Sequence, residues 1–163
     1  VEHLLGEENQ GFKVFMHNFN AERLGMAAQA CSYAQVCLDE AVDWARQRQT
    51  FGAALSERQV IRHKLVDMAM KIDAARSLVH ELAWRQAHES GDAAQLVARI
   101  CWAKILATQC MQFCADQAVQ ILGGMGFMRG TRSERIYREV KVMMIGGGSE
   151  EIMKDLAARQ LGL

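Results

Sequence analysis

The chain has 163 residues, of which half are hydrophobic and 23% are charged, so it can form one packed domain and lacks the composition of a disordered segment. Its 19 basic and 19 acidic residues give a formal net charge of zero, which argues against nucleic acid or an anionic membrane as a partner. The uncharged stretches, such as residues 105–115 and 117–128, are shorter than the roughly 20 apolar residues of a transmembrane helix, so we expect no membrane span.

The beginning of the chain and its cysteines indicate the kind of compartment. The first eight residues include three glutamates and no lysine or arginine, so they do not resemble a signal or transit peptide. The five cysteines include no Cys-x-x-Cys pair, and we expect buried free thiols in a reducing compartment. Neither the cysteines nor the five histidines have the spacing of metal ligands, so the sequence predicts no metal site.

The first predicted element is a long amphipathic helix from about Asn18 to Gln49, which Phe51-Gly52 ends. Proline is absent from the chain and helix-forming residues are abundant, so nothing interrupts such a helix. Residues on one face recur in steps of three and four, at Leu24, Ala28, Cys31, Gln35, Leu38, Val42 and Ala45, and all of them except Gln35 are apolar.

The second and third predicted helices each begin at a residue pair with the spacing of a capping box. Ser56 with Gln59 opens the second helix, Ser90-Gly91 closes it, and Asp92 with Gln95 opens the third. Gly123-Gly124 ends the third helix. The apolar stripe of the second helix is Ile61, Leu65, Met68, Ile72, Ala75, Val79 and Leu82. That of the third helix is Leu96, Ile100, Ala103, Ala107, Met111, Cys114, Ala118 and Ile121.

Two shorter helices are predicted from about Ser133 to Met144 and from Ser149 to Gln160, with three glycines between them. Because short loops join all these helices, the sequence predicts an all-α fold. We expect an up-and-down four-helix bundle with an additional C-terminal helix packed across it. The ten methionines and the three tryptophans are expected to fill the core.

Two glycine clusters at helix junctions are the candidate ligand sites. They are QILGGMGF, residues 120–127, and IGGGSEEI, residues 145–152. Glycine lets a backbone approach a ligand closely, and the second cluster leads into a helix N-terminus, which attracts anions. Helix termination alone is the alternative explanation, and neither cluster fits a P-loop or a strand-led dinucleotide motif.

Seven motifs in a fixed order carry a resemblance that spans the chain. They are GEENQGF, AERLGMAA, RQTFG, ERQ, QILGGMGF, ERIYRE and IGGGSEEI. In this order the chain resembles the C-terminal half of acyl-CoA dehydrogenases. The resemblance implies that residues 1–16 end a preceding β-domain and linker, that residues 17–163 form the helical bundle, and that the sequence is a piece of a longer protein.

The resemblance also implies an FAD enzyme that oxidises an acyl-CoA thioester to a trans-2-enoyl-CoA and passes the electrons to an electron-transfer flavoprotein. Neighbouring subunits share the flavin in this family, so a homodimer or homotetramer is implied. Arg48 would pair with the pyrophosphate, since a planar guanidinium can bind two phosphate oxygens. Carried over by motif, the FAD-binding residues are Arg48, Gln49, Thr50, Phe51, Gln59, Gln120, Ile121, Leu122, Gly123, Gly124, Ser149 and Glu151.

Removal of the α-proton of a thioester requires a carboxylate beside the α-carbon. Many members of the family carry this glutamate in the loop before the last helix, where this chain has Gly147. In the isovaleryl-CoA and long-chain subgroups the base lies instead on the first helix of the domain, one residue before an arginine. The matching residue here is Glu22, followed by Arg23. The resemblance therefore implies Glu22 as general base, with Asn20, Arg23, Gly147 and Gly148 at the acyl-thioester end of the pocket.

Several alternatives stay open at this point. Glu150 or Glu151 is the alternative base, and a flavin monooxygenase of the same fold, or a relative that has lost the base, is the alternative function. As an isolated piece the bundle could serve only in oligomerisation, and we expect it to bind FAD poorly and to be inactive alone. Gly146 and Gly147, which replace larger side chains, predict room for a long, branched or bulky acyl group. The expected compartment is a bacterial cytoplasm or a mitochondrial matrix.

Overall fold

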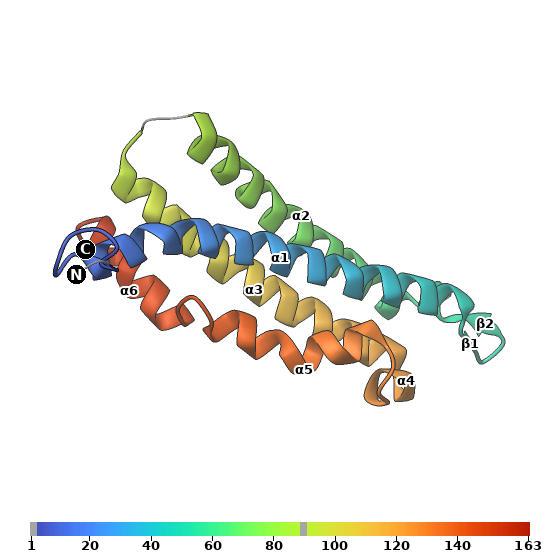
Figure 1. The fold of residues 1–163 in the computed structure, drawn as a ribbon. Helices are drawn as coiled ribbons and strands as arrows, with labels where there is room; N and C mark the ends of the chain where they lie inside the picture. The colour runs from blue at the N-terminus through green and yellow to red at the C-terminus, as the bar shows by residue number, and fades with distance from the viewer. Residues whose placement is uncertain (1–2, 89–90) are drawn as a thin grey trace.

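Helix α1, from Gly11 to Gln47, is the central element of the computed structural model, which describes residues 3–88 and 91–163 (Figure 1). It packs most extensively on α3 (Ala93–Leu122) and also contacts α2 (Gln59–His88) and α5 (Arg132–Ile145). Its buried face is rich in alanine, with Ala27, Ala30, Ala34, Ala41 and Ala45 fully buried. Such small side chains let neighbouring helices approach closely, so α1 can contact several partners at once.

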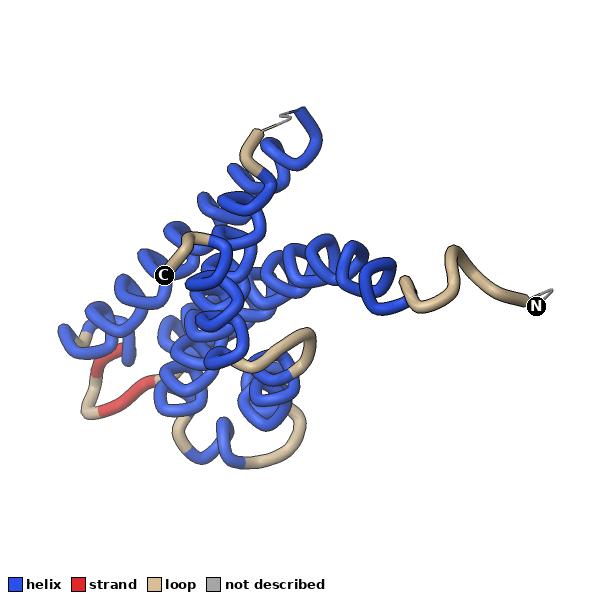
Figure 2. The backbone as a smooth tube through the Cα atoms, turned by 90° about the vertical axis from the view of Figure 1, so that its left-hand side faces the viewer, coloured by secondary structure: helices blue, strands red, loops and turns tan. Residues whose placement is uncertain are grey.

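The remaining elements are short and lie at the two ends of the bundle. Strands β1 (Gln49–Thr50) and β2 (Ala53–Ala54) pair antiparallel, with Gln49 opposite Ala54, and the 3-10 turn η1 (Leu55–Glu57) follows them. Helix α4 (Gly124–Phe127) lies at this same end, whereas α6 (Glu150–Gln160) packs on α3 at the opposite end. The described residues before α1 and the C-terminus lie toward the α6 end, and Figure 2 shows that the segment before α1 extends away from the bundle.

This arrangement confirms the predicted fold class. Helices α1, α2, α3 and α5 form the four-helix bundle, and α6 is the additional C-terminal helix (Figure 1). Among the described residues, no helix is long and apolar enough to cross a membrane, and no group of three histidine, cysteine or acidic side chains is placed to hold a metal ion. All five cysteines are buried free thiols, as expected.

Several local expectations were wrong. Helix α1 begins at Gly11, well before Asn18, and so runs through the proposed domain boundary at residues 16 and 17, which stays a prediction. The predicted capping box at Ser56 does not form, because Ser56 lies inside the 3-10 turn and α2 begins only at Gln59. By contrast, Asp92 caps α3 as predicted, since its carboxylate accepts hydrogen bonds from the amides of residues 94 and 95. Ser90, expected to help close α2, lies outside the described residues.

The expected core positions need two corrections. Ala28 is exposed, although Leu24, Cys31 and Ala45 of the predicted stripe are buried, because the buried face of α1 runs through Ala27, Ala30 and Ala34. Trp84 and Trp102 are 55% and 43% exposed and lie on the outer faces of α2 and α3. These two tryptophans therefore belong to the surface of the domain rather than to its core.

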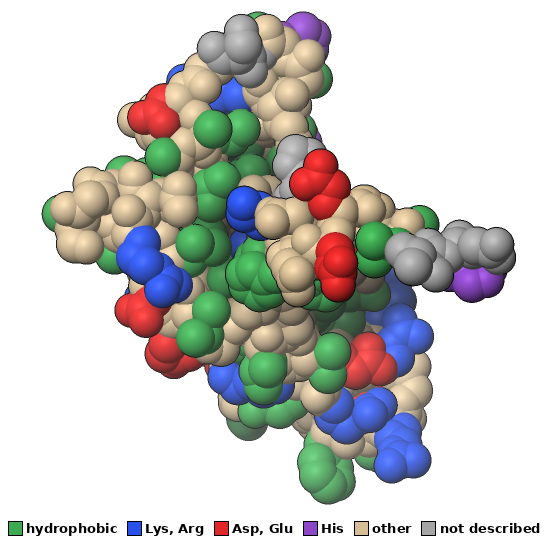
Figure 3. Space-filling view, turned by 60° about the vertical axis from the view of Figure 1, so that its left-hand side comes forward, with side chains coloured by type: hydrophobic (Ala, Val, Ile, Leu, Met, Phe, Trp, Pro, Cys, Tyr) green, Lys and Arg blue, Asp and Glu red, His purple; other side chains and the backbone are tan. Residues whose placement is uncertain are grey.

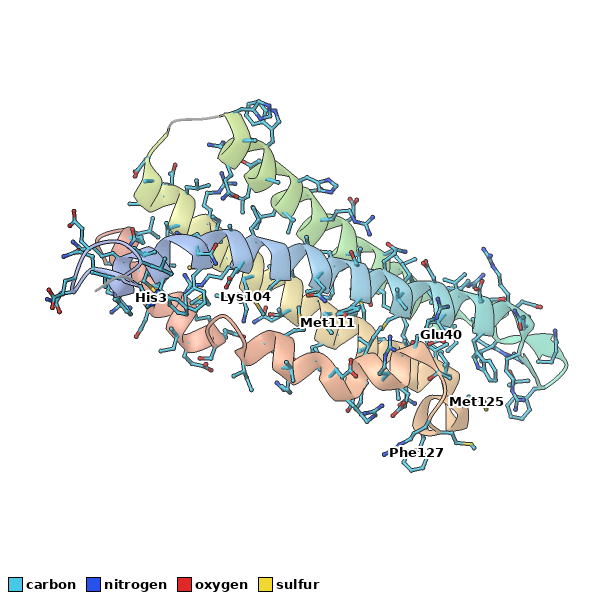
Figure 4. All side chains as sticks on the ribbon, viewed as in Figure 1. His3, Glu40, Lys104, Met111, Met125 and Phe127 are labelled. Carbon is cyan, nitrogen blue, oxygen red and sulfur yellow. The ribbon has the colours of Figure 1, made fainter. Side chains whose placement is uncertain are left out.

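Glu40 of α1 fixes the beginning of α5. Its carboxylate accepts hydrogen bonds from the amides of Arg132 (3.0 Å) and Ser133 (2.7 Å) and from the Ser133 hydroxyl (2.6 Å), while Thr131 caps the helix through the amide of Glu134. Burial raises the pKa of Glu40, but the hydrogen bonds from Ser133 and Arg132 and the charge of Arg132 outweigh burial, so the pKa lies below its usual value. Figure 4 shows Glu40 on α1 near the start of α5.

We expect Glu40→Gln to lower the free energy of unfolding at neutral pH by about 2 kcal/mol, as for other charge-assisted hydrogen bonds. Because the folded-state pKa is depressed, the wild-type advantage is complete above the unfolded-state pKa and disappears as the pH falls through the folded-state value. Urea unfolding across this pH range measures the difference. Glu139→Gln, on the exposed face of α5, is the control. If the difference in free energy of unfolding between wild type and Glu40→Gln stays the same at every pH, the proposed role of the Glu40 charge is wrong.

Candidate functional site

The predicted site residues gather at the two ends of α1. Arg23 lies near its beginning, and Arg48 follows its last residue. Their offset of 25 positions in the sequence corresponds to about 38 Å along an α-helix. The structure therefore contains two separate candidate sites, one beside the loop that connects α5 to α6 and one beside the β1–β2 hairpin (Figure 1).

The hairpin end brings together Arg48 and the first glycine cluster. The amide of Arg48 donates to the Trp44 carbonyl (2.9 Å), and its carbonyl accepts from the Leu55 amide (2.8 Å), so the backbone at Arg48 is held on both sides. Arg58 donates to the Thr50 carbonyl (2.7 Å) and so fixes the hairpin. A hollow of about 520 Å³ opens between the hairpin and the end of α3. It is lined by Trp44, Arg48, Thr50, Leu55, Ile121, Leu122, Gly123, Gly124, Met125 and Met128.

The hollow contains some of the predicted flavin residues and leaves others outside. Gln49, Phe51, Gln59 and Gln120 are exposed and do not line it. Sequence reasoning included Ile121 and Leu122 but missed the rest of the apolar lining, although Trp44 precedes Arg48 by one helical turn and so shares its face. The hollow combines an exposed guanidinium, apolar walls and glycine backbone. This donor set suits a phosphate group joined to a flat ring system.

At the other end, Arg23 joins α1 to the loop between α5 and α6. Its side chain is only 5% exposed. Nε donates to the Gly147 carbonyl (2.9 Å), Nη1 donates to Asn20 Oδ1 (3.3 Å), and the guanidinium lies 5.2 Å from the centroid of the Phe19 ring. The structure thus brings together three of the residues predicted for the thioester end of the pocket.

The loop backbone requires glycine at two positions. Gly147 and Gly148 have φ values of +69° and +120°, and only glycine adopts the second of these readily. A Cβ atom at Gly147 would lie 2.8 Å from Met26 Sδ, and one at Gly146 would lie 3.4 Å from Met26 Cε. The side chain of Met26 thus occupies part of the space that the missing loop side chains leave. The predicted widening of the pocket at these glycines is therefore partly offset by Met26.

Lys104 of α3 holds the same loop from its buried side. Its side chain is 1% exposed, and Nζ donates to the carbonyls of Met144 and Gly148, each at 2.7 Å. Burial lowers the pKa of Lys104, and the charge of Arg23 lowers it further, whereas Glu150 raises it. Figure 4 shows Lys104 in the interior of the bundle. Sequence reasoning missed this residue, although it lies one position after Ala103 of the predicted apolar stripe.

The candidate bases differ in their surroundings. Glu22 lies on the exposed side of α1, adjacent to Arg23 in sequence, and its Oε1 accepts a hydrogen bond from Asn18 Nδ2 (2.6 Å). Glu150 accepts hydrogen bonds from Lys154 (2.6 Å) and Gln109 (2.9 Å), both of which lower its pKa. Glu151 is exposed in the first turn of α6. Among the residues that the structure describes, Lys154 thus lies within salt-bridge distance of Glu150, whereas no cationic side chain lies that close to Glu22 or Glu151.

Ser149 and a second hollow complete this end of the molecule. Ser149 is the N-cap residue of α6, but its side chain makes no capping hydrogen bond. A hollow of about 400 Å³ lies between α1 and α3, with Asn20 and Ala21 on one side and Leu96, Val97 and Ile100 on the other. Glu22 does not line it. Figure 3 views this end and shows hydrophobic side chains in its recessed centre.

Comparison with known proteins identifies the family of this domain. Residues 9–162 match the model of the acyl-CoA dehydrogenase C-terminal domain family. Over 158 residues the chain is 39% identical to probable acyl-CoA dehydrogenase YngJ of Bacillus subtilis and 38% identical to the mitochondrial short-chain specific acyl-CoA dehydrogenase of Homo sapiens. These alignments cover 97% of this chain but only 40% and 37% of the two relatives.

The structural comparison gives the same result. Butyryl-CoA dehydrogenase from Megasphaera elsdenii superposes with a TM-score of 0.92 at 34% identity, over 99% of this chain and 41% of that one. The chain thus spans about 40% of the length of the relatives that it matches.

Proposed function

The chain belongs to the acyl-CoA dehydrogenase family, whose C-terminal domain it matches, and we propose that it forms this domain in an FAD-dependent enzyme that oxidises acyl-CoA thioesters to trans-2-enoyl-CoA. The observation that carries the proposal is the contact between Arg23 of α1 and the carbonyl of Gly147. It brings a helix that carries a carboxylate, at Glu22, against a loop that lacks one. Membership of the family does not by itself identify the base in a chain that has glycine, at Gly147, in place of the loop glutamate.

In the proposed mechanism Glu22 removes the α-proton of the acyl thioester. A carboxylate acts as a base near neutral pH when water is excluded from it, because desolvation raises its pKa. Glu22 is exposed in the 163 residues, so the proposal requires other parts of the full-length protein to cover it. Asn18 holds one carboxylate oxygen and leaves the other free to accept the proton. When bound, FAD supplies the acceptor for the β-hydride.

The loop supplies a hydrogen-bond donor for the thioester carbonyl. Its amides at Gly146 and Gly148 donate to the carbonyls of Val142 (2.8 Å) and Ile145 (3.2 Å). Within residues 3–88 and 91–163, the amide of Gly147 has no acceptor. We assign this amide to the thioester oxygen, on which negative charge develops as the α-proton leaves.

The hollow at the hairpin end fits the nucleotide part of FAD. Arg48 would hold the pyrophosphate, and Ile121, Leu122, Gly123 and Gly124 would surround the adenosine. We assign Gln49, Thr50, Phe51, Gln59 and Gln120 to the rim of the same site, and Ser149 and Glu151 to the flavin end of a second FAD. One dinucleotide is too short to reach from Arg48 to Glu22 of the same chain, since about 39 Å of helix separates them.

This separation supports an enzyme of at least two copies, in which FAD held by Arg48 of one copy reacts beside Glu22 of the other. Exposed apolar residues on α2 and α3, among them Val66, Met70, Trp84 and Trp102, are available for association. We therefore propose a homodimer or homotetramer. An electron-transfer flavoprotein is the proposed electron acceptor, and a bacterial cytoplasm or a mitochondrial matrix is the proposed compartment, as bacterial and mitochondrial proteins are both among the relatives.

Anaerobic titration of the full-length flavoprotein with acyl-CoAs of different chain lengths tests the function. Reduction of the flavin bleaches its visible absorbance, and at least one acyl-CoA is expected to cause it. If no acyl-CoA bleaches the flavin, the dehydrogenase proposal fails, and a flavin monooxygenase of the same fold becomes the candidate.

Met26 is expected to restrict the acyl group, because its side chain lies against the positions of Gly146 and Gly147. Met26→Ala should therefore raise kcat/KM for longer or branched acyl-CoAs relative to the best wild-type substrate by about tenfold, the usual value for one or two methylene-sized groups. The same titration panel measures this ratio, with Met70→Ala on the outer face of α2 as control. An unchanged chain-length profile would show that Met26 does not face the substrate.

A further inference from the structure

Two buried cations hold the loop between α5 and α6 from opposite sides. Lys104 of α3 donates to the carbonyls of Met144 and Gly148, each at 2.7 Å, and Arg23 of α1 donates to the carbonyl of Gly147 at 2.9 Å. The ammonium group of Lys104 thus links the carbonyl of Met144, two residues before the first glycine, to the carbonyl of Gly148, the last glycine. The three residues between these carbonyls form an arch whose base is closed by Lys104.

Neither cation is neutralised by an acidic partner. Across residues 3–88 and 91–163, no carboxylate lies within salt-bridge distance of Arg23 or Lys104. Glu150 is the acidic group that interacts with Lys104, and it is already bonded to Lys154 and Gln109. The C-terminal end of α5 contributes part of the compensation, since the last carbonyls of a helix carry partial negative charge.

Stability of the core does not explain a lysine at this position. A fully buried ammonium group loses its hydration, and an apolar side chain of the same length at this buried position would avoid that cost. The loop, in contrast, has carbonyls that only a donor can satisfy. This contrast indicates that Lys104 serves the conformation of the loop.

We propose that Lys104 is a positioning residue for the reaction, which fixes the arch of Ile145, Gly146 and Gly147 so that the Gly147 amide points toward the substrate. This inference rests on the proposed dehydrogenase function. Because the carbonyls on both sides of the arch are held, rotation of the 146–147 peptide is restricted, and the amide stays available for the thioester oxygen. Lys104 itself does not contact the substrate.

The experiment compares three full-length flavoproteins: wild type, Lys104→Met and Met111→Ala. The methionine in the first variant keeps the length of the side chain and removes its donors and charge. The second variant removes a fully buried apolar side chain two turns further along α3 and controls for a general loss of core packing. Hydrogen exchange of the amides of residues 145–149 is measured first, since it does not depend on activity. Stopped-flow reduction by acyl-CoA then gives the rate and the KM.

Lys104→Met is expected to accelerate exchange in residues 145–149 by about tenfold or more relative to both other proteins, since the loop carbonyls lose their donor. Its rate of flavin reduction should fall by about 10- to 100-fold with KM changed by less than about threefold, because a misplaced amide weakens the transition state more than the bound substrate. Met111→Ala should show neither effect. If Lys104→Met does not fold, Lys104→Gln, which keeps an uncharged NH2 donor group on a shorter side chain, enters the same measurements with the same expected direction.

The proposal is overturned if Lys104→Met exchanges and reacts like wild type, or if Met111→Ala shows the same loss. Failure of the proposed function has a different signature. In that case wild type itself is not reduced by any acyl-CoA, while the exchange measurement still decides whether Lys104 holds the loop.

Discussion

Glu22→Gln in the full-length protein is expected to slow the reduction of flavin by acyl-CoA at least about a thousandfold, within the range for loss of a general base. Glutamine keeps the shape of the side chain and its hydrogen bond to Asn18, but it cannot take the α-proton. Binding of the acyl-CoA should be nearly unchanged. Stopped-flow absorbance under anaerobic conditions measures the rate for each variant.

Glu150→Gln is the matched control, because it removes a carboxylate beside the same loop and Glu150 has no assigned role in binding FAD. It should retain more than about a tenth of the wild-type rate, as surface ion pairs contribute little. If Glu22→Gln reacts as fast as wild type and Glu150→Gln does not, the base lies at the start of α6 and the assignment to α1 is wrong.

Arg48→Gln is expected to weaken the binding of FAD by about a hundredfold, equivalent to about 3 kcal/mol for a charge-assisted bidentate contact. The backbone around Arg48 should stay in place, since its amide and carbonyl are bonded to Trp44 and Leu55 independently of the side chain. Fluorescence of released flavin during dilution measures the dissociation constant. Arg46→Gln, two residues earlier and exposed, is the control for a general loss of positive charge. Equal losses from both variants would assign the effect to charge rather than to a specific phosphate contact.

The helical fold could be predicted because its determinants are local. Apolar residues at helical spacing marked the buried faces of α2 and α3, and Asp92 and the glycine pairs marked their ends. The beginning of α1 was not predictable in this way, because GEENQGF contains turn-forming residues up to Gly11. The β1–β2 hairpin was also missed, since two-residue strands leave no alternation to detect.

The candidate sites were only partly predictable. The order of the motifs identified Arg23, Gly147 and Arg48 as candidate site residues. Contacts between segments that are distant in the sequence depend on tertiary packing, which a local sequence pattern does not predict. Lys104 is the clearest case: its partners lie 40 and 44 residues further along the chain. A lysine within an apolar stripe is nevertheless a signal, because a buried charge requires acceptors nearby.

The continuity of α1 has a consequence for how this domain can change in evolution. An unbroken helix joins Arg23 to Arg48. The number of residues between them therefore sets the angle, about the helix axis, between the directions in which the two ends of the helix face. Inserting or deleting one residue would rotate one end against the other by about 100° and shift it by about 1.5 Å. Both ends would remain intact as local structures, yet they would no longer match the proposed second copy. The spacing of the two arginines thus constrains the length of α1, and we expect length variation only in the connections outside this helix.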